Sequence, residues 1–492
     1  RPENSGFIFT HSMLQEAIYN SYLSKQKKEL HDTAAGWYSG KDTMLEAQHL
    51  DRAESPKAAD AYLNATKECR EHFLFTRGLP LAQRGIELSQ QVSVGYQLIC
   101  LQAYMTREIG NAEEAITLYK NGLQMTEEEE LHCEAWIGIA ACNRWMGKGE
   151  KSVEVLEKTE KVAELNDLPL RLTQVGYYRG SYLFTQNQLG EAEISYQTGL
   201  KNAKICEDRL WAARNLSGLA DCYYASMRMS KALSAFRECL DIAHDEGLGR
   251  IEVANRYMTG LTRRYLNEIR EALEDATAAK QLAVEVGHHR SEMYSTNFTA
   301  EFLLDMGRTK EAIVASTRAM ELTHLTGNER FRAYAMNQLA RGLMVNGDQD
   351  EAMKTLNNAI EISRKVGMTF VGPRLLGTLS ICSKDNQIRR AALKEGSEIL
   401  ESGCHAHNQL WFLRDAIDSS LISDNRKSAL KYSNRLESIT EQEPLPWANY
   451  FIKRARAIVR HRQNPNEQTN TEELTRLTNL AKEVGFATHT MS

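Results

Sequence analysis

The sequence predicts an all-α protein in which about ten antiparallel helical hairpins stack side by side. Turn-forming residues return every 40 residues along much of the chain, and small residues keep fixed distances from them. Apolar residues follow the three- and four-residue spacing of helices, and no run alternates as a strand would. At 492 residues the chain is longer than one core usually serves, which favours a core that grows from repeat to repeat.

The turns define the repeat. Segments such as EIGNAEEA, DMGRTKEA and VNGDQDEA align on an Ala near a helix start, and the turn residue lies five positions before that Ala. The aligned turn positions are Gly110, Gly147, Asn187, Met227, Asn267, Gly307 and Gly347. Gly and Asn tolerate the left-handed backbone that closes a helix, whereas Met227 fits poorly. A second set, Gly247, Gly287, Gly327 and Gly367, predicts that each period holds two helices.

Small residues predict a close crossing inside each hairpin. Seven residues before the turns lie Ala103, Ala140, Gly180, Ala220, Gly260, Ala300 and Ala340. Two helices approach closely only where a side chain at the crossing is small. Five residues after the turns the side chain is again small, from Ala115 and Ser152 to Ala352. The hairpin is therefore the unit of packing.

Proline and weaker turns suggest the remaining boundaries. Pro80, Pro169, Pro373, Pro444 and Pro446 coincide with other boundary signals, so we expect helix interiors to lack proline. Weaker copies of the turn are expected near Arg77, Asn386 and Asp424. We expect a loop or a small disordered insert from Gln463 to Thr471 and a last helix from about Leu474 to Val484.

The order small, small, bulky, small resembles the tetratricopeptide repeat, at the ~40-residue period of maltose-activator-like regulators and signalling ATPases. The resemblance covers about residues 58 to 440 and implies a TPR-like α-solenoid, a right-handed superhelix of hairpins. The first-helix Trp and the following Pro of the shorter repeat are mostly absent. Residues 441–492 are expected to cap the array as C-terminal helices.

The amino-terminal segment does not fit the repeat. It resembles the end of the winged-helix module in STAND-type signalling ATPases, through Phe9, His11, Gln15, Glu16, Tyr19, Lys27, Lys28, Leu30 and His31. Residues 1–57 are therefore expected to hold the end of such a module and linking helices. The resemblance implies a bacterial parent protein with an ATPase or a class III adenylate or guanylate cyclase domain upstream of Arg1. The alternative is an ordinary amphipathic helical pair.

Composition narrows the function classes. The net charge is -5 and the one short basic run, Lys453 to Arg462, is flanked by acidic segments, so we expect no nucleic-acid partner. No apolar run approaches the ~20 residues that span a bilayer, so no membrane partner is expected either. Nine cysteines without a CxxC pair indicate free thiols in a reducing, cytoplasmic setting.

Signals for chemistry are weak. Gly40-Lys41-Asp42-Thr43 lacks the order of a phosphate loop. The adjacent His288 and His289 point apart on a helix, and Cys404, His405 and His407 lack a third ligand on their face. The acidic run Glu127 to Glu130 is typical of a solvated helix start. We therefore expect no catalytic residue, metal or cofactor in this segment.

The resemblance also implies where a partner binds, because the first helix of each hairpin lines the concave groove. Positions ten, six and three residues before the turns give the candidates Arg107, Arg144, Tyr177, Phe184, Tyr224, Tyr257, Arg264, Asn297, Asn337 and Arg341. Aromatic residues and Arg form binding hot spots, and Asn can hold a peptide backbone. The three arginines at one register favour an acidic segment or a peptide carboxylate. The alternative is that the aromatic residues pack between hairpins.

Three functions follow. The first is a protein-binding or peptide-binding scaffold or sensor arm of a signalling ATPase or nucleotide cyclase, whose ligand is a protein, a peptide or the parent's own catalytic domains. The second is a free-standing regulator with the same groove, for which a homo-oligomer is open. The third is an enzyme with a site built in the groove, which needs an acid, a base and a nucleophile within hydrogen-bonding reach.

Overall fold

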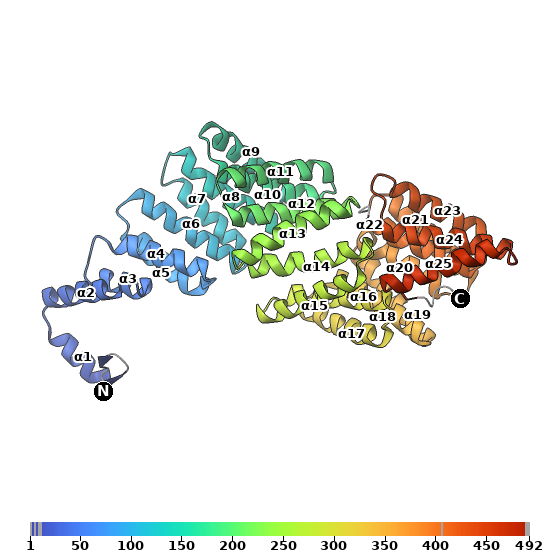
Figure 1. Cartoon of the computed structure of the whole chain (residues 1–492). Helices are drawn as coiled ribbons and strands as arrows, with labels where there is room; N and C mark the ends of the chain where they lie inside the picture. The colour runs from blue at the N-terminus through green and yellow to red at the C-terminus, as the bar shows by residue number, and fades with distance from the viewer. Residues whose placement is uncertain (1, 4–5, 8–11, 405–406, 488–492) are drawn as a thin grey trace. The chain divides into compact units, whose positions relative to one another are not determined.

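The computed structural model describes residues 2–3, 6–7, 12–404 and 407–487. Apart from one pair of two-residue strands, the regular structure of these residues is helical. The chain divides into two compact units, Arg1–Tyr182 and Leu183–Ser492. Within each unit antiparallel helix pairs follow one another (Figure 1). The predicted all-α solenoid of TPR-like hairpins is therefore confirmed.

The first unit begins with the antiparallel strands β1 (Pro2–Glu3) and β2 (Gly6–Phe7). Its helices are α1 (Ser12–Ser21), α2 (Ser24–Tyr38), α3 (Thr43–Arg52), α4 (Ala58–Glu71), α5 (Phe75–Leu88), α6 (Val92–Glu108), α7 (Ala112–Leu123), α8 (Glu129–Trp145), α9 (Gly149–Leu165) and most of α10 (Pro169–Thr185). The hairpin repeat starts at α4.

The second unit continues the repeat with longer and more regular helices. These are α11 (Leu189–Ile205), α12 (Arg209–Ala225), α13 (Met229–Asp245), α14 (Gly249–Tyr265), α15 (Ile269–Glu285), α16 (His289–Asp305), α17 (Thr309–Leu325), α18 (Glu329–Asn346), α19 (Gln349–Val366), α20 (Met368–Cys382), α21 (Asn386–Glu401), α22 (His407–Ile422), α23 (Arg426–Ile439), α24 (Pro446–Gln463) and α25 (Gln468–Val484). The even-numbered helix is the first of each hairpin.

The predicted turns adopt the left-handed backbone. Both sets of turn glycines have positive φ, and so do Asn187 and Asn267. Met227, which suits the position least by residue type, also has a φ of 63°. The repeat therefore imposes the turn conformation even where the side chain opposes it.

The predicted crossings are also confirmed. The seven small residues before the turns are all buried, as are the small residues that follow the turns. A methyl group on Gly260 of α14 would lie 2.8 Å from the carbonyl oxygen of Ala272 on α15. The two backbones are thus close enough that hydrogen is the only side chain that fits at this point.

Two prolines correct the boundary prediction. Pro80 and Pro373 lie inside α5 and α20, whereas Pro169 and Pro446 begin helices as expected. A proline inside a helix leaves the carbonyl four residues earlier without its usual donor. For Pro373 the residue four positions earlier is Thr369. Its carbonyl oxygen instead accepts a hydrogen bond from the thiol of Cys404, with a sulfur–oxygen distance of 2.8 Å.

Two further boundaries differ from the prediction. The weak turn expected near Arg77 lies at Phe73, which has a φ of 58°, so Arg77 belongs to α5. The loop expected to reach Thr471 ends before Gln468, where α25 begins. Asn470 in its first turn donates to the backbone oxygen of Asn464 at 3.3 Å, so polar side chains typical of loops here hold a helix start.

The amino-terminal helices meet through a chain of hydrogen bonds. Tyr19 of α1 donates to Nε2 of His31 on α2 at 2.9 Å, and Nδ1 of His31 lies 2.8 Å from Nδ1 of His49 on α3. Only one of these two Nδ1 atoms can carry a proton, so at least one of the two rings must be neutral. Burial lowers the pKa of both histidines, helped at His31 by His49 and at both by Arg52. Two residues of the amino-terminal pattern, Tyr19 and His31, thus have a structural role, while Phe9 and His11 lie outside the described residues.

The close crossing can be tested by adding one methyl group. Gly260→Ala should lower the free energy of unfolding by about 1 to 3 kcal/mol, because the backbone of α15 must move. Gly190→Ala is the matched control, since its added methyl group meets nothing within 4 Å and improves helix propensity. Urea unfolding followed by far-UV circular dichroism measures both. Equal stability of the two variants would contradict the close crossing.

The histidine pair predicts acid-sensitive anchoring of α1. Because the pKa of each histidine is lowered from 6.5 in the folded state, a state in which α1 has detached and uncovered His31 takes up protons first as the pH falls below that value. Anchoring is therefore strongest above pH 6.5 and weakens below it. Hydrogen exchange of the α1 amides, corrected for intrinsic rates, should show lower protection at pH 5.5 than at pH 7.5. In His49→Gln this pH dependence should largely disappear.

Candidate functional site

The first helices of the second unit form a continuous wall. α12, α14, α16, α18 and α20 contact one another in order. The registers ten, six and three residues before the turns share one helix face, because they are separated by four and three residues. Of the predicted residues, Phe184 is half-buried on α10, and the others of this unit lie on α12 to α18.

The candidates of the first unit have internal contacts. Arg107 on α6 is buried, and its Nη2 donates to Glu108 at 2.7 Å while its guanidinium lies 4.8 Å from the ring centre of Tyr104. Arg144 on α8 is half-buried; its Nη1 donates to the Ser181 hydroxyl at 2.7 Å, and its buried Nε has no partner. Tyr177 on α10 is half-buried beside Tyr178.

The aromatic candidates join larger ring clusters. Tyr224 is buried, and its ring centre lies 5.0 Å from that of His407 and 6.3 Å from that of Tyr265. Tyr257 is half-buried and lies 5.6 Å from Phe298 and 5.7 Å from Tyr294. Tyr224 therefore packs between helices, whereas Tyr257 keeps part of its surface on the wall.

Arg264 belongs to a buried ion network centred on Glu301 of α16. The arginine is fully buried and pairs with both Glu301 and Asp305. Arg374 of α20 reaches the same Glu301 carboxylate at 2.8 Å. Burial alone raises the pKa of Glu301, but the charges of Arg374 and Arg264 outweigh it and lower the pKa to about 2. Glu301 is therefore ionised at neutral pH and holds two first helices to α16.

A single indole ring connects this network to the carboxy-terminal hairpins. Trp411 of α22 lies 3.6 Å from the guanidinium of Arg264, 4.0 Å from that of Arg374 and 4.2 Å from that of Arg414. Guanidinium groups stack well on an indole face. Three cations from α14, α20 and α22 thus converge on one aromatic side chain.

Arg341 on α18 completes the network. It pairs with Asp415 of α22, whose carboxylate also accepts from Arg414 at 2.9 Å. Burial lowers the pKa of Arg341, and Asp415 opposes that effect. In total four arginines and three carboxylates from five first helices lie together: Arg264, Arg341, Arg374, Arg414, Glu301, Asp305 and Asp415.

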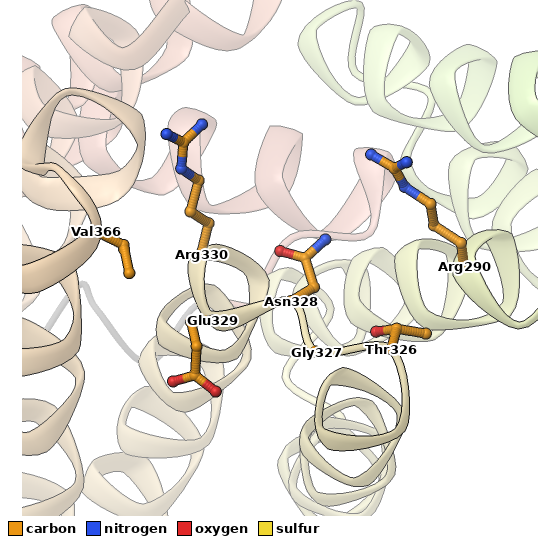
Figure 2. Close-up of a pocket in the computed structure, with 7 residues that line it drawn as sticks. All are labelled: Arg290, Thr326, Gly327, Asn328, Glu329, Arg330 and Val366. Atoms are coloured by element: carbon orange, nitrogen blue, oxygen red, sulfur yellow. The ribbon is translucent and has the colours of Figure 1, made fainter. Parts of the chain in front are cut away.

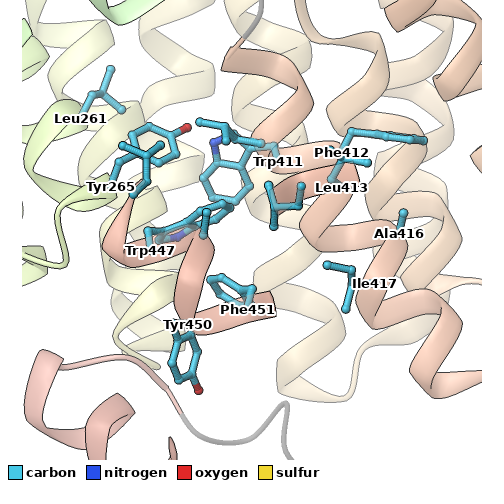
Figure 3. Packing of buried hydrophobic residues seen from close by; sticks show 14 of the residues in the cluster. Leu261, Tyr265, Trp411, Phe412, Leu413, Ala416, Ile417, Trp447, Tyr450 and Phe451 are labelled. Carbon is cyan, nitrogen blue, oxygen red and sulfur yellow. The ribbon is translucent and has the colours of Figure 1, made fainter. Parts of the chain in front are cut away.

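Apolar packing extends the same contact. Figure 3 shows Tyr265 of α14 beside Trp411 of α22 and Trp447 of α24, and Leu261 belongs to the same apolar cluster. The ring centres of Tyr265 and Trp447 are 5.3 Å apart, and Trp447 is fully buried. The backbone amide of Ala487 also donates to the carbonyl of Asp305 at 2.6 Å. The carboxy-terminal hairpins therefore pack onto the wall and occupy part of it, so Arg264 and Arg341 have partners within the chain.

Unlike the arginines, the predicted residues Asn297 and Asn337 have no side-chain partner among the described residues. They occupy the same register on α16 and α18, one repeat apart, and both are fully buried. Neither the amide nitrogen nor the oxygen of either side chain has a hydrogen-bond partner among the described residues. Buried carboxamides are normally satisfied by protein, water or a ligand. Because both side chains are fully buried, a ligand could reach them only after they turn toward the surface of the wall.

A separate pocket lies at the far-end turns. It has a volume of about 520 Å³ and lies at the starts of α16 and α18, where Arg290 and Arg330 extend toward the same side (Figure 2). Nε of Arg290 donates to the hydroxyl of Tyr294 at 2.8 Å, and Asn328 accepts from the Phe331 amide at 3.3 Å. The pocket is lined by residues of the turn between α17 and α18 and by residues at the ends of α16, α18 and α19, and it contains none of the predicted wall residues.

The structure adds little to the weak chemical signals. Among the described residues no three His, Cys, Asp or Glu side chains gather as a metal site requires. His405 lies outside those residues, Cys404 donates to the Thr369 carbonyl, and His288 accepts from the Ser291 amide. All nine cysteines are free. None of the described helices is long and apolar enough to cross a membrane.

Trp411, Arg374, Arg414 and the carboxylates that bind the arginines were not predicted from the sequence. A signal was present for part of the set, because Arg374, Arg414 and Arg454 are also spaced by 40 residues. Arg414 lies ten residues before the turn at Asp424, which has a φ of 50°. Extending the wall registers onto the weaker repeats would have found it.

Solved structures resemble the chain in fold. One is a Rap protein in complex with competence and sporulation factor, with 17% identity over 70% of this chain and 98% of that chain and a TM-score of 0.56. Another is a STAND protein with a tetratricopeptide repeat sensor from Pyrococcus horikoshii, with 16% identity over 71% of this chain and a TM-score of 0.55. This chain covers 54% of that STAND protein. No family model and no curated protein sequence matches the chain.

Neutralising Glu301 tests the ion network. Glu301→Gln should lower the free energy of unfolding by about 3 to 5 kcal/mol at pH 7, because Arg264 and Arg374 then remain buried without their shared counter-ion. The stabilisation by ionised Glu301 is present above pH 4.5 and is lost as the pH falls toward about 2, so the difference between the proteins should shrink in acid. Glu321→Gln on the exposed face of α17 is the control, and urea midpoints measure all three proteins. A shift no larger than that of the control would contradict the network.

Proposed function

We propose that this chain is a regulatory module that binds a peptide or an extended protein segment along the wall of first helices. The observation that carries this proposal is the pair of buried, unpartnered carboxamides of Asn297 and Asn337. A carboxamide offers one acceptor and two donors, which match the N–H and C=O of a peptide bond. Two such groups on neighbouring first helices could each bind one peptide unit of an extended backbone.

The cost of these unpartnered groups supports a binding role. A buried polar group without a hydrogen bond destabilises a protein by about 1 to 3 kcal/mol. An apolar side chain of similar size would avoid that cost at both positions. The stability of the free chain therefore does not explain carboxamides at both positions, and a peptide is the partner that we propose for them.

The likeness to solved structures is consistent with this function. The Rap protein was crystallised in complex with competence and sporulation factor, and the STAND protein carries its repeat as a sensor. These proteins share the helical-repeat architecture with the present chain. A ligand-binding regulator is thus within the range of functions that this architecture serves in them.

We extend the proposal to the parent protein and the cellular setting of the module. The module is either the sensor arm of a larger signalling ATPase or nucleotide cyclase, which then also offers its own catalytic domains as partners, or a free-standing regulator, with a homo-oligomer open in both cases. A phosphate-loop sequence in the reading frame upstream of Arg1 would favour the first, and a start codon at that point the second. The free thiols support a cytoplasmic setting, and a bacterial source follows only from the resemblance of the amino-terminal segment.

Two expectations about chemistry are also retained as proposals. We infer that the segment has no catalytic activity, because the arginines and carboxylates around Trp411 neutralise one another rather than stand free as acids or bases. An acidic ligand group is best matched by Arg144 in the first unit, whose Nε is unpartnered, since Arg107 and Arg264 already bind carboxylates.

Asparagine substitution tests the function. The probe is a pool of random nonapeptides, acetylated and amidated at their ends, passed over the immobilised full chain. Asn297→Leu/Asn337→Leu should reduce the retained peptide at least about tenfold, the equivalent of one lost hydrogen bond or more. The same variant should be as stable as the unmodified chain or more stable, because it loses two unsatisfied groups.

The control is Asn357→Leu on the exposed face of α19, which should retain peptides normally. If no peptide is retained by the unmodified chain above a blank surface, the proposed function is wrong. If the double variant retains as much peptide as the control, peptide binding does not use these carboxamides.

A further inference from the structure

Carboxylates recur at one register of the wall in the second unit. Asp221, Glu301 and Asp418 each lie six residues before their turn, on α12, α16 and α22. Glu301 is bound by Arg264 and Arg374, and Asp418 accepts from Nη1 of Arg454 at 2.5 Å. Among the described residues, no hydrogen bond or ion pair reaches the side chain of Asp221. The same position thus carries a paired carboxylate twice and an unpaired one once.

The surroundings of Asp221 disfavour its ionised form, because no counter-ion in the described part of the chain lies beside it. The side chain is half-buried on the wall, so water still reaches it. Burial raises its pKa to about 7, with no nearby positive charge to offset the loss of solvent. Its negative charge acts on Tyr257 of the next first helix, where it helps burial and Tyr294 to raise the pKa of the phenol. Asp221 therefore lies beside the half-buried aromatic candidate on the wall.

We propose that Asp221 binds the guanidinium or ammonium group of one Arg or Lys side chain in a basic peptide. This inference rests on the proposed peptide-binding function and specifies its ligand. At the equivalent register the chain itself supplies an arginine to Glu301 and to Asp418. A ligand that brings its own cation would complete the same contact at Asp221, and the low polarity around it would strengthen the ion pair.

A row of aromatic rings beside Asp221 can receive the rest of the peptide. The ring centres of Tyr257 and Tyr294 are 5.7 Å apart, those of Tyr294 and Phe331 4.4 Å, and those of Phe331 and Phe370 5.2 Å. All four rings are half-buried, and they come from α14, α16, α18 and α20. The row offers apolar surface on successive first helices, so the ligand should combine one cation with apolar side chains.

The spacing of the helices sets the length of the ligand. Packed helices lie about 10 Å apart, so the three steps from α12 to α18 cover roughly 30 Å. An extended chain advances about 3.3 Å per residue, so about nine residues span that distance. A nonapeptide is therefore the appropriate probe.

The charges elsewhere on this wall do not favour an acidic ligand. Arg264 and Arg374 share Glu301, and Arg341 and Arg414 share Asp415. Each of these arginines forms an ion pair with a carboxylate of the chain, whereas Asp221 has no counter-ion among the described residues. On the wall of the second unit the acidic group without a counter-ion is thus the Asp221 carboxyl.

The random nonapeptide pool described above tests the inference on the full chain. Peptides retained by the unmodified chain should be enriched in Arg and Lys relative to the input pool. For the best retained peptide, replacing its Arg by citrulline, which has the same shape without charge, should weaken binding at least about tenfold. In Asp221→Asn the same replacement should change the dissociation constant less than about twofold. Fluorescence anisotropy gives each constant.

Asp241→Asn on the exposed face of α13 is the matched control and should behave like the unmodified chain. Circular dichroism checks that Asp221→Asn is folded, and Asp221→Ser serves if it is not. Retained peptides without enrichment in basic residues would overturn the inference while leaving peptide binding intact. An equal effect of citrulline in Asp221→Asn would overturn it as well. Failure of the unmodified chain to retain any peptide would overturn both the inference and the proposed function.

Discussion

The close crossing of two helices inside each hairpin fixes the orientation of nearly every other side chain. At Gly260 the backbones approach so closely that an added methyl group would lie 2.8 Å from the Ala272 carbonyl oxygen. Since this position must face the partner helix, the residues three positions before it and four and one positions after it are rotated by roughly 60°, 40° and 100° from it about the helix axis, all toward the same side of the crossing. These are the wall registers that hold Tyr257, Leu261 and Arg264. The location of the candidate site is thus a consequence of a packing constraint.

The same constraint explains which parts of the fold could be predicted from the sequence. Turn position depends on local backbone conformation, and the 40-residue spacing placed the turn at Met227 even though its side chain argued against it. The prediction that helix interiors lack proline was wrong, because the free-energy cost of a proline in a helix depends on whether another segment supplies the lost hydrogen bond. Inside α20 the carbonyl freed by Pro373 accepts a thiol from another hairpin, and no local pattern reveals that donor. Local signals therefore fixed the repeat, and errors arose where a distant segment supplied a hydrogen bond.

The candidate site shows the same division. The registers correctly put Arg264 and Arg341 on the first helices, but their partners are separated from them by tens of residues in the sequence. Arg341 binds Asp415, and Arg264 stacks on Trp411, because the carboxy-terminal hairpins pack onto the earlier wall. A register states which face a side chain occupies and leaves open whether another part of the chain covers that face. Aromatic and Arg residues are favoured both in interfaces and in such internal contacts, so residue type could not separate the two roles.

The wall consequently has two kinds of polar group with different energetic consequences. The ion network around Trp411 is nearly closed, with each carboxylate bound by at least one arginine, and it joins α14, α16, α18, α20 and α22. The side chains of Asn297, Asn337 and Asp221 are open, that is, without a partner among the described residues. The two buried carboxamides destabilise the free chain, and burial raises the pKa of Asp221. Only open groups can gain hydrogen bonds or an ion pair when a ligand arrives, since closed ones must first lose their own. A binding surface on this wall therefore requires some unsatisfied polar groups, and the extensive buried packing of the same helices keeps the fold stable enough to retain them.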